Sequence, residues 1–136
     1  HAHIIMWPFI IHSRPICLKA IDKFTGRREH DWVSVAKACS ALAQETAGRV
    51  SRMTGLAPIA SPEFCAPQMV AMPIPECDAP ALHLKLFEKH RIEIPVFKWQ
   101  DRHIARVSVQ GYNSREQMTI LIKALAEELG LPATDI

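Results

Sequence analysis

The clearest alternation of hydrophobic and polar positions lies in two neighbouring segments, 92–99 and 103–110. Successive side chains of a strand point to opposite faces, so the second segment would have one apolar face and one polar face. The apolar set is Ala105, Val107 and Val109, and the polar set is Arg106, Ser108 and Gln110. Since residues 100–102 between the segments are all polar, the pattern predicts an antiparallel hairpin with a tight turn.

Other segments repeat their apolar residues every three or four positions, which predicts amphipathic helices over 32–53, 79–89 and 115–129. Each is preceded by a residue suited to cap a helix: Asp31, Asp78, and Ser114 with Gln117 as a capping box. In the second helix we expect Leu82, Leu86 and Phe87 to point inward. The segment 68–74 predicts a strand with apolar residues on both faces.

These elements follow the order α-β-α-β-β-α. That order predicts an α+β fold, in which a small antiparallel or mixed sheet carries helices on one face. The 136 residues suffice for one hydrophobic core. We expect a single α+β domain over 27–136, and an apolar N-terminal segment, 1–26, that forms a strand against this domain or a partner.

Composition excludes several classes of function. The net charge of +2 is weak and no basic run carries interleaved aromatic residues, so no nucleic-acid partner is expected. The four cysteines form no CxxC pair and the seven histidines do not cluster at ligand spacing, so no metal site is expected. The apolar run Ile4 to Ile11 is too short to span a membrane and has no basic leader, so the expected location is cytoplasmic.

The candidate chemistry lies on the polar face of the segment 103–110. An arginine in mid-strand, with a hydroxyl and an amide on the same face, suits a planar anion such as a carboxylate, because the guanidinium can donate two parallel hydrogen bonds. The alternative is a solvated strand face, which is the usual state of a polar face in an antiparallel sheet. The pattern by itself leaves both interpretations open.

The sequence IEIPV, followed by a short turn and ARVSVQGYNSREQ, resembles the C-terminal signature of class V aminotransferases. More narrowly, it is similar to the isopenicillin N epimerase-like branch of these fold type I pyridoxal-phosphate (PLP) proteins. EHDW at 29–32, TGLAP at 54–58 and QMVAMPIP at 68–75 follow in the family's order, so the resemblance covers about Asp22 to Leu129. It implies the C-terminal small domain of an enzyme that epimerises, transaminates or cleaves amino acids.

The resemblance also implies a substrate-binding set. The family's carboxylate-binding arginine corresponds to Arg106, with Ser108 and Gln110 beside it, and Tyr112 and Asn113 match the same motif. Because asparagine is a favoured residue at helix starts, a structural role for Asn113 remains open. The expected substrate-binding residues are Arg106, Ser108, Gln110 and Asn113, and no catalytic residue is expected.

The family's cofactor machinery lies upstream of the matched region. No lysine of the chain stands in the context of the Schiff-base lysine, and Gly26-Arg27-Arg28 leads directly into Glu29, where family members carry a GTRD-like segment. We therefore expect a partial PLP protein that binds no PLP by itself and is inactive alone. Its expected partners are a large PLP-binding domain or a second copy of the chain, with an amino-acid carboxylate as ligand. The alternative is a stand-alone α+β module that binds amino acids or dimerises without catalysis.

Overall fold

The structure is a computed structural model that describes residues 4–5 and 31–132. The N-terminal segment proposed for 1–26 lies outside the described residues except for β1 (Ile4–Ile5), a short strand parallel to β3 (Ile92–Glu93). Whether the rest of the segment 1–26 pairs with this domain or with a partner stays a prediction, as does the domain boundary at 26–27.

Three strands form the central sheet of the described chain: β2 (Met69–Ile74), β4 (Val96–Trp99) and β5 (Arg102–Ser108). The order is β2-β5-β4, and both pairs are antiparallel. The predicted hairpin is therefore confirmed as β4 and β5, which are joined through Gln100 with its backbone in the left-handed region. In this order β2 is an edge strand, a position that tolerates Pro73, which has no N–H to donate.

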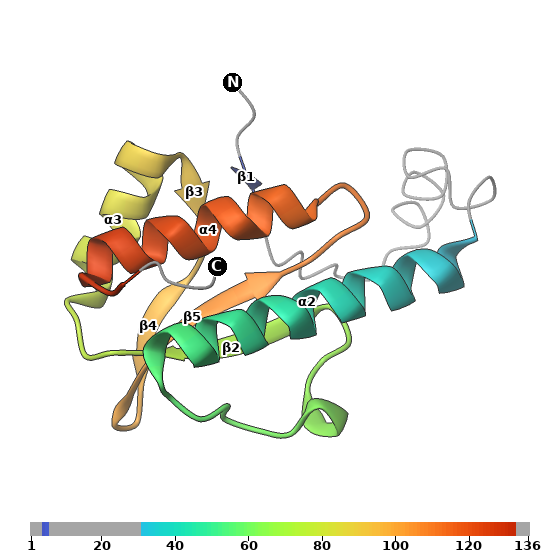
Figure 1. The fold of residues 1–136 in the computed structure, drawn as a ribbon, viewed down its shortest axis with the longest axis horizontal. Helices are drawn as coiled ribbons and strands as arrows, with labels where there is room; N and C mark the ends of the chain where they lie inside the picture. Colours follow the sequence, from blue (N-terminus) through green and yellow to red (C-terminus); the bar gives the residue numbers. More distant parts are fainter. Residues whose placement is uncertain (1–3, 6–30, 133–136) are drawn as a thin grey trace, which may run out of the picture.

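The helices α2 (Trp32–Thr54), α3 (Ala79–His90) and α4 (Arg115–Leu129) pack on one side of the sheet, so the expected α+β fold is confirmed. Figure 1 shows α2 and α4 crossing in front of the strands. A short 3-10 helix, Pro62–Phe64, interrupts the loop before β2. Among the described helices none has the length and hydrophobicity needed to cross a membrane.

One hydrophobic core fills the space between the helices and the sheet. One face of β2 and β5 packs against the apolar stripes of the helices, while Pro73, Ile104 and Ser108 are buried on the opposite face. The strands contribute Val70, Met72, Ile74, Ile92, Ala105 and Val107 to the core, and Val109 follows directly after β5. The prediction that Ala105 and Val107 share the core face of β5 is therefore confirmed, whereas Ile104, on the opposite face, is also buried, at 2% exposed.

The predicted helix starts are confirmed by hydrogen bonds. Asp31 Oδ1 accepts from Ser34 N at 3.3 Å, and Asp78 Oδ1 accepts from Ala81 N at 3.0 Å. At α4 the capping box is complete, because Ser114 Oγ accepts from Gln117 N and Gln117 Oε1 accepts from Ser114 N. The orphan N–H groups of the first turns are thereby paired.

Two expectations need correction. The strand predicted over 92–99 is divided into β3 and β4, because Pro95 supplies no N–H to a ladder and the chain bends there. Phe87 does not point inward but is 40% exposed. It follows Leu86 by one residue, which turns it about 100° away from the buried stripe of α3.

Candidate functional site

Arg106 lies in the central strand of the sheet, on the face opposite the hydrophobic core. Its register partner on β2 is Ala71, and on the β4 side its N–H donates to the carbonyl of Pro95 at 3.0 Å. Both flanking residues have short or rigid side chains, so the guanidinium meets no long neighbour directly across the strands. The expected placement of Arg106 on the face away from the apolar set is what the structure shows.

The Arg106 side chain is partly buried, and its Nε is closed to solvent without a hydrogen-bond partner among the described residues. A guanidinium remains charged at any physiological pH, and a buried donor without an acceptor is costly. A planar anion on this face would supply the missing acceptor and could bind the guanidinium through two parallel hydrogen bonds. The geometry therefore fits a carboxylate.

Ser108 shares the face of Arg106 and is buried opposite Met69. The other two expected ligands, Gln110 and Asn113, lie beyond the end of β5. There Gln110 N donates to Asn113 Oδ1 at 2.9 Å, and Asn113 Nδ2 donates to Gln117 Oε1 at 3.2 Å. Both polar atoms of the Asn113 side chain are thus used to connect the strand end to the start of α4.

Gln68 completes this connection, and the sequence pattern gave no indication of its role. Its side-chain Nε2 donates to the backbone carbonyl of Val109 at 3.1 Å, while the backbone carbonyl of Gln68 accepts from Val109 N at 2.8 Å. The backbone and the side-chain amide of Gln68 together extend the β2–β5 pairing by one residue past Ser108. Tyr112, which matches the family motif, is 66% exposed beside this network. The substrate-binding role of all four expected residues stays a prediction.

A second polar cluster joins α3 to α4. Lys89 Nζ lies 2.7 Å from Glu127 Oε1 and 2.8 Å from Glu128 Oε1, and His90 Nε2 lies 3.0 Å from Glu128 Oε1. The hydrogen bond from Lys89, followed by that from His90, lowers the pKa of the 7% exposed Glu128 to about 2. The pKa of Lys89 is raised by the same carboxylates. Because the ammonium occupies both carboxylates, we interpret the cluster as an interhelical ion-pair network.

The described residues do not fit a PLP site. A Schiff base needs a lysine in a sheltered pocket. The described lysines are all exposed on helix or strand surfaces: Lys37, Lys85, Lys89, Lys98 and Lys123. The structure thus supplies no step of cofactor chemistry from these residues.

No family model and no curated protein matches the chain. Solved structures do. Alanine–glyoxylate aminotransferase from Nostoc sp. superposes with a TM-score of 0.56 and 24% identity, over 65% of this chain and 24% of that chain. An 8-amino-7-oxononanoate synthase from Francisella tularensis superposes with a TM-score of 0.57 and 17% identity, over 85% of this chain and 31% of that chain.

These similarities show that the chain shares an α+β fold with part of each of these two enzymes. The chain spans about a quarter of the length of the first enzyme and about a third of the second. At such low identities the likeness concerns the fold alone. The activity of a complete protein and the narrower isopenicillin N epimerase-like assignment are therefore matters for proposal.

Proposed function

We propose that this chain is the C-terminal small domain of an isopenicillin N epimerase-like, class V aminotransferase-like protein, and that it binds the carboxylate of an amino-acid substrate. The observation that supports the proposal best is the buried Nε of Arg106, which has no hydrogen-bond partner among the described residues. The shared fold with PLP enzymes and the motif around Arg106 agree with this role.

In this role Arg106 orients the substrate by donating hydrogen bonds to its carboxylate on the sheet face away from the helices, and the Ser108 hydroxyl lies on the same face two residues further along β5. The amide network of Gln68, Asn113 and Gln117 fixes the end of β5 and therefore the strand that carries Arg106. PLP would supply the electron sink for chemistry at the α-carbon. A large domain would have to hold it, so we assign no proton transfer to the described residues.

The test is a titration of the chain with a panel of amino acids. Binding is monitored through the backbone amide signals of β5 in NMR spectra. We expect shifts around Arg106 at millimolar ligand in the native chain and none in Arg106→Met. Arg106→Lys retains the charge but not the two-point donor geometry, so it should restore binding only in part. Arg52→Met, an exposed arginine near the end of α2, is the matched control and should bind like the native chain.

A stand-alone amino-acid-binding module is the second candidate, because the same unpartnered guanidinium would serve it. The two candidates differ in affinity. A module contains its whole site and should bind a preferred amino acid at micromolar concentration, whereas half of an enzyme cleft should bind at millimolar concentration or weaker. Isothermal titration calorimetry that compares the native chain with Arg106→Met distinguishes them, and a chain that shows no Arg106-dependent binding of an amino acid contradicts both.

A further inference from the structure

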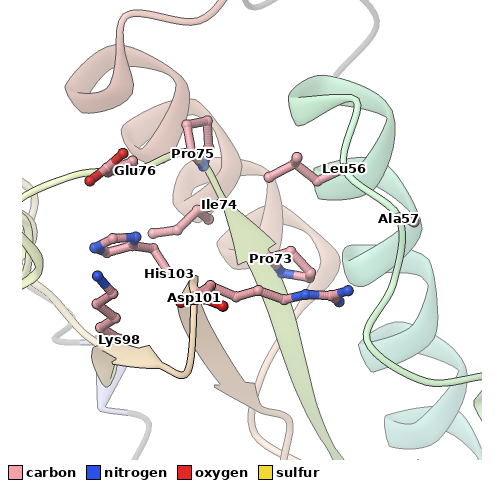
Figure 2. Close-up of a pocket in the computed structure, with 10 residues that line it drawn as sticks. Leu56, Ala57, Pro73, Ile74, Pro75, Glu76, Lys98, Asp101 and His103 are labelled. Atoms are coloured by element: carbon pink, nitrogen blue, oxygen red, sulfur yellow. The ribbon is translucent and has the colours of Figure 1, made fainter.

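A pocket of about 530 Å³ opens at the end of the sheet where β2 ends and the β4–β5 hairpin turns (Figure 2). Its volume is within the usual range for small-ligand sites. The last residue pair of the β2–β5 ladder, Ile74 and His103, lies in its wall. Arg106 is not among the lining residues, so this pocket is distinct from the carboxylate site proposed above.

Half of the lining is apolar. It comes from the loop after α2 and from the end of β2: Leu56, Ala57, Pro73, Ile74 and Pro75. Pro73 and Ile74 are buried, and two prolines restrict the backbone on either side of Ile74. This wall is therefore formed before any ligand arrives and presents a surface for an apolar group.

The other half carries charge of both signs. Lys98 and Arg102 are positive, Glu76 and Asp101 are negative, and all four side chains are exposed at the rim. Within the described part of the chain none of the four forms an ion pair. The charged donors and acceptors around the pocket therefore remain free of ion pairs with described residues and can contact a ligand.

His103 joins the rim to the interior. It is only 9% exposed and is the cross-strand partner of Lys98. Its ring forms no hydrogen bond with another described residue. Its ring nitrogens are nevertheless not closed to solvent, unlike Arg106 Nε. Figure 2 shows His103 and Lys98 projecting from neighbouring strands, with Glu76 beyond them. The imidazole is therefore available to a ligand inside the pocket.

We propose that this pocket binds a free α-amino acid with an apolar side chain. Lys98 and His103, which are cross-strand partners, supply donors for the carboxylate, and Glu76 and Asp101 supply acceptors for the ammonium group. The side chain packs on Leu56, Pro73 and Ile74. A simple anion would leave the two carboxylates unused, and the two positive and two negative side chains at the rim sum to zero, which suits a zwitterion.

The experiment uses three ligands of matched shape: L-leucine, 4-methylpentanoate, which lacks the ammonium group, and 3-methylbutylamine, which lacks the carboxylate. Each is titrated into the Arg106→Met variant, so that the carboxylate site proposed above does not contribute. We expect leucine to shift the His103 ring signals in NMR spectra. Each analogue should bind at least about tenfold more weakly than leucine, since each lacks one set of charge-assisted hydrogen bonds.

Variants test the individual contacts. Lys98→Met and Glu76→Gln should each weaken leucine binding about tenfold, and both residues are exposed, so the fold should be retained. Lys123→Met, an exposed lysine on α4, should change nothing. The proposal is overturned if millimolar leucine leaves the His103 ring signals unchanged, if the amine binds as well as leucine, or if Lys98→Met binds like its parent. Failure of the Arg106 site would instead appear in the native chain, as the loss of Arg106-dependent shifts along β5.

Discussion

The two faces of β5 differ although they share one backbone. Ala105, Val107 and Val109 are completely buried against the helices, where each side chain has apolar neighbours from the same chain. On the other face Arg106 keeps a buried nitrogen without a partner among the described residues. The helix face is complete within this chain, whereas on the opposite face, where Ile104 and Ser108 are also buried, Arg106 Nε has no partner among the described residues. This difference is the basis of the binding function proposed for the face of Arg106.

A comparison of two shielded charges leads to the same conclusion. Glu128, in the helical layer, is 7% exposed and accepts from both Lys89 and His90. Arg106, on the sheet, has no such partner at Nε in the described residues. Proteins pair the charges that they bury for structural reasons, so an unpaired one is more typical of a ligand site.

The largest expected effect is on the helix face of the sheet. Met72→Ala removes a side chain that is almost fully buried in the core and should lower the free energy of unfolding by about 2–5 kcal/mol, because a cavity remains. Urea unfolding followed by circular dichroism measures this. Ala71→Ser, one residue away on the open face, is the control and should change stability by less than about 1 kcal/mol. Equal losses would contradict the contrast between the faces.

A smaller effect is expected where the open face meets α4. Asn113→Ala deletes the hydrogen bonds to Gln110 N and Gln117 Oε1 and should cost about 1–2 kcal/mol of stability. Tyr112→Ala changes the exposed neighbouring residue and should cost less. If Asn113→Ala leaves the urea midpoint where it is, the amide network does not hold the end of β5.

The third expectation concerns Arg106 itself. Arg106→Met should not destabilise the chain and should raise the free energy of unfolding by up to about 1 kcal/mol, because the buried donor without an acceptor is removed. A loss comparable with that of Met72→Ala would show that the guanidinium has a structural partner. Unfolding curves of the two variants under one set of conditions give the comparison directly.

The last expected effect is the pH dependence of the paired charge. The folded-state pKa of Glu128 lies below its ordinary value, so its ion pairs stabilise the fold above about pH 4.5 and are lost as pH falls toward 2. Glu128→Gln should therefore reduce proton uptake on unfolding in this window by up to about one proton. Stability measured at several acidic pH values tests this, and an unchanged slope would contradict it.

The sequence by itself determined the local elements and the two faces of the sheet. Periodicity and capping residues such as Asp31, Asp78 and Ser114 act over a few neighbours, so they are visible in one dimension. They also placed Arg106 on the face away from the core. The motif resemblance gave the fold class that the solved structures support.

Only the tertiary structure decided which polar side chains meet. Gln68 contacts Val109 across strands that lie far apart in sequence, Asn113 is used inside a turn, and Lys98, His103 and Glu76 gather at one pocket. These contacts depend on the strand register and on the packing of the loop after α2. Since register depends on the whole sheet and the core beneath it, no short stretch of sequence specifies it.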